Sequence, residues 1–271
     1  MTKIRNTFYQ ILDEGYSKWI FIIPSAILLA LLALPLASLV LRSINSELFK
    51  NAFSEQAFKA LKISLITSST TTAIAAVLGT PLAFVLARWK IKHKSWIEMI
   101  LDLPIVLPPS VAGLALLIAF GRRGLFGSTL GIFGVSLPFT TAAVVLAQIF
   151  VSAPLYVRSA RIGFAQIDIQ LEESAHVEGA NQWQVFSEVM IPLTRRALVS
   201  GAILTWTRAL GEFGATILFA GNLEGVTQTM PMAIYLGFER NLGVAVALSV
   251  VLIFVSIILL MVMKKLEKHE D

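Results

Sequence analysis

Residues 173–192 read ESAHVEGANQWQVFSEVMIP, a polar stretch that lies between two long apolar segments. The segments at 138–157 and 197–221 are each long enough, at about 1.5 Å per helical residue, to cross a bilayer core of about 30 Å. The interval between them, 158–196, is far longer than a turn between two neighbouring helices requires. The polar stretch therefore predicts a structured loop outside the membrane.

This loop is expected to contain two short helices. Propensity favours one helix over 169–177, which Gly179 would end, and a second over 182–190 before Pro192. An amphipathic helix that lies on lipid headgroups is the alternative. The loop is rich in acidic residues, which suit anionic headgroups poorly, so contact with another protein is the favoured interpretation.

The composition of the whole chain is that of a membrane protein. Of the 271 residues, 56% are hydrophobic and 14% are charged, and a soluble fold could not bury that much apolar surface. The chain has no cysteine and three scattered histidines, so it offers neither disulfides nor a recognisable metal site. The net charge of +5 arises from short basic clusters rather than from one basic face, which argues against nucleic acid as a partner.

The apolar stretches predict six transmembrane helices within a single membrane domain, residues 1–271. Three prolines at the start of the third span, Pro104, Pro108 and Pro109, predict a broken or late-starting helix there. Six crossings place both termini on the same side of the bilayer. The expected spans are 19–41, 63–87, 103–121, 138–157, 197–221 and 241–263.

Basic residues orient the expected bundle. Lys and Arg accumulate in cytoplasmic loops of membrane proteins, and most of those outside the spans share a side with the termini. The first loop on the other side, between residues 42 and 62, is a local exception. This asymmetry predicts cytoplasmic N- and C-termini and a cytoplasmic loop at 158–196.

The spacing within residues 173–192 resembles the cytoplasmic signature of bacterial and archaeal ABC importer permeases. That signature is Glu-Ala-Ala, three residues, Gly, nine residues and Ile-x-Leu-Pro, and it fits this chain without a gap. Three positions depart from the consensus with side chains of similar size, namely Ser174 for Ala, Val189 for Ile and Ile191 for Leu. The resemblance implies that the first short helix docks into a cleft of an ATP-hydrolysing subunit and that the glycine lets the chain turn. The matching residues are Glu173, Ser174, Ala175, Gly179, Val189, Ile191 and Pro192.

Six spans with a long loop between the fourth and the fifth also resemble the core of type I importer permeases. Within that group, residues 103–113 (LPIVLPPSVAG) and 208–216 (RALGEFGAT) are similar to segments of molybdate and sulfate permeases, and the second is closer to the molybdate type. The resemblance implies a permease that carries an oxyanion into the cytoplasm. Molybdate is the favoured anion, with sulfate or tungstate as alternatives.

The partners follow partly from the residues and partly from the resemblance. One chain with six helices makes a thin conduit, so we expect a homodimer with the path near its two-fold axis. The chain has no Gly-rich phosphate loop and no catalytic constellation, so we expect no enzymatic activity and no bound cofactor.

The resemblance implies two ABC subunits that use ATP and Mg, an extracytoplasmic oxyanion-binding protein, and a location in the prokaryotic cell (inner) membrane. A secondary transporter or channel is the alternative from another class, although neither needs the long inner loop.

An ion pair is expected inside the membrane. Arg208 lies about 16 Å into the fifth span, and Glu212 follows one helical turn later. Arg208 could supply positive potential along an anion path, or the pair could fix helix packing or a dimer interface. Gly211 and Gly214 would permit close helix approach. The hydroxyl run 67–72 in the second span is better explained by interhelical hydrogen bonds than by anion binding.

Overall fold

The computed structural model describes residues 16–43 and 47–268, and every regular element in these ranges is a helix. The expected all-α architecture is confirmed. The two chain ends, for which the sequence predicts a cytoplasmic location, lie outside the described residues. The helices are α2 (Tyr16–Arg42), α3 (Glu47–Ala52), α4 (Glu55–Arg88), α5 (Lys94–Val106), α6 (Pro109–Phe120), α7 (Gly127–Ile132), α8 (Thr141–Gln166), α9 (Ile169–Val177), α10 (Gln182–Gln184), the π-helix η1 (Val185–Met190), α11 (Ile191–Leu210), α12 (Gly214–Phe219), α13 (Met230–Arg240) and α14 (Leu242–Lys268).

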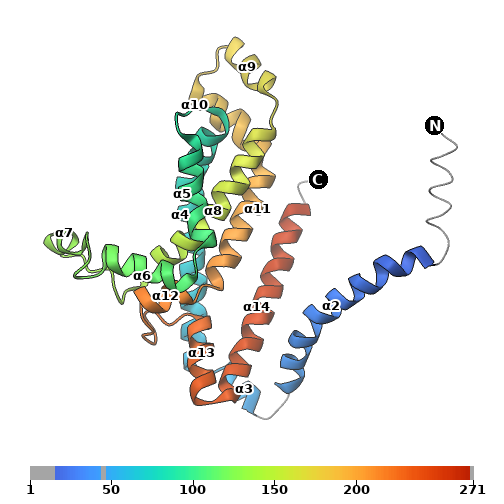
Figure 1. Cartoon of the computed structure of the whole chain (residues 1–271), viewed down its shortest axis with the longest axis vertical. Coiled ribbons are helices and arrows are strands. Elements are labelled where there is room, and N and C mark those ends of the chain that lie inside the picture. Colours follow the sequence, from blue (N-terminus) through green and yellow to red (C-terminus); the bar gives the residue numbers. More distant parts are fainter. Residues whose placement is uncertain (1–15, 44–46, 269–271) are drawn as a thin grey trace.

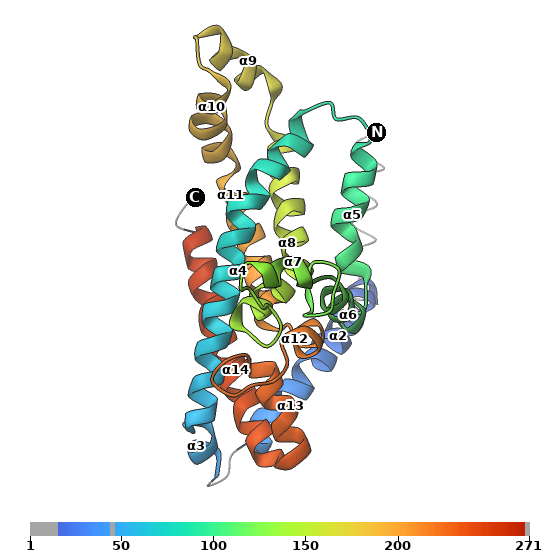
Figure 2. The ribbon, with the colours of Figure 1, turned by 90° about the vertical axis from the view of Figure 1, so that its left-hand side faces the viewer.

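Three long helices, α4, α8 and α11, pack side by side at the centre of the molecule (Figures 1 and 2). At Gly79 of α4, an added Cβ would lie 2.9 Å from the ring of Tyr156 on α8. The Tyr156 hydroxyl shares a 2.7 Å hydrogen bond with Thr80. Close approach over a small residue, reinforced by an interhelical hydrogen bond, is typical of helix pairs in membranes, where apolar side chains gain little by leaving lipid.

Two of the expected spans are interrupted. Residues 103–121 do not form one helix, because α5 ends at Val106 and α6 begins at Pro109 with an axis bent by 115°. The residue before a proline avoids the helical region, whereas a proline at the first position of a helix loses no hydrogen bond. The fifth span is also interrupted, although no proline lies there, since α11 ends at Leu210 and α12 begins at Gly214.

The expected number of six crossings is not fully supported by helix length and composition. Within the described ranges four helices are long and apolar enough to cross a membrane, namely α2, α4, α8 and α14, and the bent pair α5 and α6 would make a fifth. The remaining candidate, α11, has 20 residues and carries Arg195, Arg196 and Arg208. The chain is nevertheless a multi-pass membrane protein.

The helices on either side extend into the loop expected at 158–196. α8 continues to Gln166, beyond the expected end of the fourth span at residue 157, and α11 already begins at Ile191. The segment between them forms one end of the molecule, with α9 and α10 at the top of Figure 1. The opposite end holds α3 and α13, and α2 lies apart from the central helices (Figure 1).

Candidate functional site: an exposed loop and an interrupted membrane helix

The two short helices expected from the sequence form the exposed loop. α9 spans Ile169–Val177, and α10 with η1 spans Gln182–Met190. Asp168 starts α9 by accepting a 3.0 Å hydrogen bond from the backbone N–H of Gln170. Gly179 lies between the two helices with a φ of +95°, a backbone conformation that favours glycine. Local capping and turn chemistry therefore define this loop.

The residues that match the signature divide into an exposed half and an anchored half. Glu173, Ser174 and Gly179 are exposed and lie at the free end of the loop, while Ala175 is half-buried. Val189 and Ile191 are half-buried at the junction of η1 and α11, and Pro192 occupies the first turn of α11. The exposed half is available to a partner, and the other half joins the loop to the bundle.

An aromatic cluster fastens η1 to the central helices. The ring of Phe186 lies 4.9 Å from that of Phe84 on α4 and 6.2 Å from that of Phe164 on α8, measured between centroids. Phe84 and Phe164 are themselves in edge-to-face contact at 5.5 Å. Such contacts add to the gain from apolar burial. These packed rings connect η1 directly to α4 and α8.

Arg88 also connects the loop to the bundle. In the sequence it contributes only to the count of basic residues that predicts the orientation. Its Nη2 donates a 2.7 Å hydrogen bond to the carbonyl oxygen of Ile167, between α8 and α9. Its Nε lies 3.4 Å from a carboxylate oxygen of Glu172 in the first turn of α9. These partners are about eighty residues away along the chain, so spacing within a helix could not reveal them.

The structure contains the ion pair between Arg208 and Glu212. Arg208 Nη1 lies 2.7 Å from Glu212 Oε2, and the side chains are 35% and 1% exposed. The sequence predicted this contact from two positions one turn apart on the same helix. In the structure α11 ends at Leu210, so the two residues do not share one continuous helix. The contact lacks hydrogen-bond alignment, so it is best described as a charge pair.

The charges of this pair match the ends of the two half-helices. Glu212 Oε1 accepts a 2.9 Å hydrogen bond from the backbone N–H of Ala215, in the first turn of α12. Arg208 lies in the last turn of α11. A carboxylate near a helix N-terminus and a cation near a C-terminus are both favoured by the backbone dipoles. The buried carboxylate is thus held by protein groups, whereas the guanidinium remains partly accessible.

The two interruptions lie next to each other. A Cβ added at Gly214 would lie 2.7 Å from Cβ of Pro109, and one added at Gly113 would lie 2.8 Å from the carbonyl oxygen of Ala215. α6 and α12 are therefore in close contact, as Figure 2 also shows. Gly214 lies at a close approach, as expected, whereas Gly211 lies at the end of α11 with only the Thr207 carbonyl nearby, 3.7 Å from an added Cβ.

Hydroxyl groups of the run 67–72 form interhelical hydrogen bonds. The buried amide of Gln148 on α8 accepts from Thr71 at 3.1 Å and donates to Thr67 at 3.2 Å. It also donates to the carbonyl oxygen of Ala209 at 3.0 Å. Ser69 accepts a 3.2 Å hydrogen bond from the indole of Trp206. These contacts agree with the structural interpretation of the run, and they fix the end of α11 beside the interruption.

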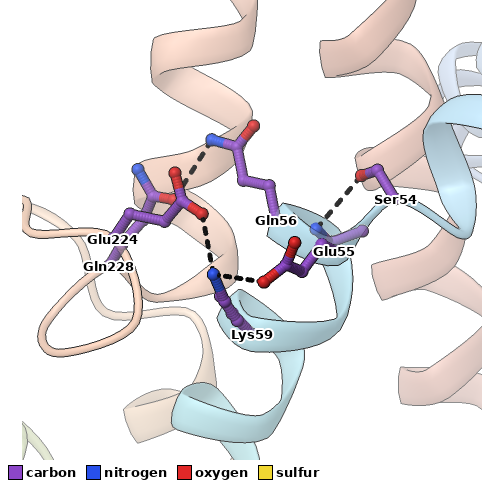
Figure 3. A network of polar contacts seen from close by, with 7 residues as sticks. Ser54, Glu55, Gln56, Lys59, Glu224 and Gln228 are labelled. Carbon is purple, nitrogen blue, oxygen red and sulfur yellow. Dashed lines mark hydrogen bonds and ion pairs between the residues drawn. The ribbon is translucent and has the colours of Figure 1, made fainter.

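The opposite end of α4 is held by a polar network (Figure 3). Lys59 lies 2.7 Å from Glu55 and 3.4 Å from Glu224, which belongs to the segment between α12 and α13. In the same place, Gln56 donates a 3.1 Å hydrogen bond to Gln228. α4 is therefore connected at one end to α9 and at the other to the chain that follows α12.

A pair of aromatic rings lies beside the interruption. The centroids of Phe213 and Tyr235 are 5.1 Å apart. A hydrogen bond from the phenol to Glu239 raises the pKa of Tyr235 above its ordinary value, and the negative charge of that carboxylate acts in the same direction. Tyr235 is therefore a neutral hydrogen-bonding group at neutral pH.

The groups singled out from the sequence form two separate sites. The signature residues gather at the free end of the loop and at its junction with α11, and Arg208, Gly211, Glu212 and Gly214 gather at the interruption. Within residues 16–43 and 47–268, no cluster of three His, Cys, Asp or Glu residues could hold a metal ion. Interrupted helices that carry charged residues are typical of membrane transport proteins.

The chain belongs to the family of binding-protein-dependent transport system inner membrane components, whose profile matches residues 79–269. It is 36% identical over 254 residues to the probable transport system permease protein NifC of Clostridium pasteurianum, covering 93% of this chain and 88% of that protein. It is 39% identical over 239 residues to the molybdenum transport system permease protein ModB of Mycobacterium bovis, covering 88% of this chain and 90% of that protein.

A solved structure shares the fold. A chain of a bacterial ABC transporter involved in the import of the acidic polysaccharide alginate superposes with a TM-score of 0.80 at 16% identity, covering 97% of this chain and 99% of that chain. The protein is thus a permease subunit with the fold of type I ABC importers, in the group of molybdate and sulfate permeases.

Proposed function

We propose that the chain is the membrane conduit of an ATP-driven importer of molybdate. The observation that carries the proposal is Arg208, a partly accessible cation at the interruption between α11 and α12. Its carboxylate partner is buried and already bound to the start of α12. An anion that reaches this place would meet the guanidinium rather than the carboxylate, and positive charge in a low-dielectric setting attracts an oxyanion.

The identity of the anion is supported by the relatives. The Mycobacterium bovis protein is called a molybdenum transport system permease, and residues 208–216 resemble the molybdate type more than the sulfate type. Molybdate, tungstate and sulfate are all tetrahedral dianions, so one arginine attracts each of them by charge alone. Discrimination therefore belongs mainly to the binding protein that delivers the anion, and sulfate or tungstate remains the alternative cargo.

The transporter would consist of two copies of this chain, each a single membrane domain, with two ABC subunits and an extracytoplasmic oxyanion-binding protein. In this arrangement the signature residues, Glu173 to Pro192, contact the ABC subunit from the cytoplasmic side. The termini would also be cytoplasmic. This chain would bind no cofactor, since ATP and Mg act in the ABC subunits, whose closure moves the loop and opens the conduit outward.

The test is an ATPase and uptake assay of the reconstituted complex with binding protein loaded with molybdate, tungstate or sulfate. Molybdate-loaded protein should stimulate ATP hydrolysis and uptake most strongly. Stimulation by sulfate-loaded protein alone would change the assigned cargo. Uptake that follows an ion gradient and ignores ATP would support a secondary transporter instead.

A further inference from the structure

Arg88 lies at the point where the exposed loop leaves the bundle. It is the last residue of α4, and its side chain is 11% exposed although it carries a charge. Its Nη2 donates to the carbonyl oxygen of Ile167 at 2.7 Å, the residue that follows α8. One side chain therefore connects the end of α4, the end of α8 and the beginning of α9.

The burial of Arg88 makes these contacts necessary. A charged side chain that leaves water needs hydrogen bonds and an opposite charge to offset the loss of hydration. The Ile167 carbonyl, at a helix end without an intrahelical partner, supplies the hydrogen bond. Glu172, itself 20% exposed, supplies the opposite charge. Glu172 directly precedes the signature residues but lies against the bundle, whereas its neighbour Glu173 is exposed.

The contact with Glu172 is not fully formed. The Arg88 Nε atom is buried and has no hydrogen-bond partner among the described residues, yet the Glu172 carboxylate stands only 3.4 Å away. A small displacement of α9 would align the two groups and turn a charge contact into a charge-assisted hydrogen bond. The state of this contact therefore depends on the position of α9.

The far end of α4 is fixed as well. Lys59 and Gln56 bind Glu224 and Gln228 in the segment that follows α12 (Figure 3). The first turn of α12 is in turn bound by Glu212, the partner of Arg208. A shift of α4 along its axis would thus act on α9 at one end and on the segment that follows α12 at the other.

We propose that Arg88 is a positioning residue that transmits the movement of α9 to α4 during the transport cycle. The inference rests on the proposed function for the source of that movement. Arg88 touches neither ATP nor the anion. Its loss should leave the subunits assembled and should weaken the connection between ATP hydrolysis and opening of the conduit.

The experiment compares Arg88→Met with Lys90→Met in the complete reconstituted complex. Lys90 is an exposed cation two residues further on, so its variant controls for the loss of charge on this face. Both complexes should assemble and hydrolyse ATP at the basal rate. In Arg88→Met, stimulation of hydrolysis by molybdate-loaded binding protein and the amount of molybdate imported per ATP should each fall by about tenfold. Normal stimulation and normal import per ATP in Arg88→Met would overturn the proposal.

Two milder variants show whether the charge of Arg88 and Glu172 or the shape of the guanidinium is needed for the transmission. Arg88→Lys keeps the charge but lacks the planar fork that reaches two acceptors, so it should fall between the wild type and Arg88→Met. Glu172→Gln keeps an acceptor and removes the charge, and it should lower import per ATP with unchanged assembly. If Arg88→Met does not accumulate in the membrane, Arg88→Lys and Glu172→Gln test the proposal in its place. Normal import per ATP in both would overturn it.

A distance measurement separates this inference from the proposed function. Spin labels at Val77 on α4 and Val177 on α9, which are 72% and 88% exposed, report whether the two helices move together. In the wild-type complex the distance between the labels should be narrowly distributed, and in Arg88→Met the distribution should broaden. An unchanged distribution in Arg88→Met would refute the role of Arg88. A wild-type complex that hydrolyses no ATP would instead refute the proposed function.

Discussion

Arg208 and Glu212 interact across the gap between two half-helices rather than along one continuous helix. Their separation of four residues predicted a contact, and the structure contains one. However, α11 ends at Leu210, and Glu212 accepts a hydrogen bond from the backbone N–H of Ala215. This arrangement gives the carboxylate two roles, since it pairs with the arginine and caps the start of α12. A variant that removes only the charge must therefore preserve the second role.

The double variant Arg208→Met with Glu212→Gln meets that requirement. The amide oxygen that replaces the carboxylate can still accept the hydrogen bond from Ala215, and no unpaired ion remains. Replacing only one partner would instead leave an unpaired buried charge, which costs about 3–5 kcal/mol of stability. If Arg208 attracts the anion, assembly and basal ATP hydrolysis should persist while molybdate uptake falls steeply. Near-normal uptake by the double variant would assign the pair to packing.

Gln148 shows why some of the important residues could not be found from the sequence. A glutamine in an apolar span suggests an interhelical hydrogen bond, but not that its amide joins Thr67, Thr71 and the carbonyl of Ala209. The same holds for Arg88 and Glu172. Such partners are distant along the chain, so only the packing of α4, α8 and α11 brings them together.

At the level of the elements, local signals located the helices of the exposed loop well. Gly179 marks the turn after α9, as the sequence predicted, because its effect is local to the backbone. Asp168 caps the start of α9, a role that the sequence analysis did not assign to it. Prolines at 108 and 109 likewise marked the interruption of the third span. They did not predict the bend of 115°, because that angle depends on the contact of α6 with α12.

Gly179 offers a test of the loop as a coupling element. Proline is confined to a φ near −65° and cannot adopt the observed +95°, so Gly179→Pro should displace α9 from η1. The variant should insert in the membrane but bind the ATPase subunit weakly or hydrolyse ATP without import. Gly179→Asn is the milder comparison, since asparagine adopts positive φ more readily than other non-glycine residues, and its import should fall less than that of Gly179→Pro. Wild-type import by Gly179→Pro would exclude a coupling role for this turn.

Glu173→Lys tests the docking contact from the exposed side of α9. Reversing the charge replaces attraction to a basic partner with repulsion, typically a change of a few kcal/mol at a close interfacial pair. Co-purification of the ATPase subunit should decline while the amount of permease in the membrane stays constant. Full co-purification and normal uptake would contradict docking through this carboxylate.

For the whole molecule, the absence of cysteine in the sequence makes the orientation testable. Single cysteines at Val177 and Trp183, both strongly exposed in the loop, should be protected from an impermeant thiol reagent in intact cells. A cysteine at Leu223, which is 46% exposed at the other end of the molecule, should react. Labelling of Val177→Cys from outside would show that the loop faces the outside, and the loop could then not dock to a cytoplasmic ATPase subunit.

The length of α4 has a consequence for the lipid around the protein. With 34 residues, the helix is about 51 Å long, whereas the hydrocarbon core is about 30 Å thick. Its charged ends, Lys59 and Arg88, are therefore expected near the two headgroup layers. Because the cost of hydrophobic mismatch depends on bilayer thickness, we expect the acyl-chain length of the lipids to affect the position of α4 and, through it, the rate of transport.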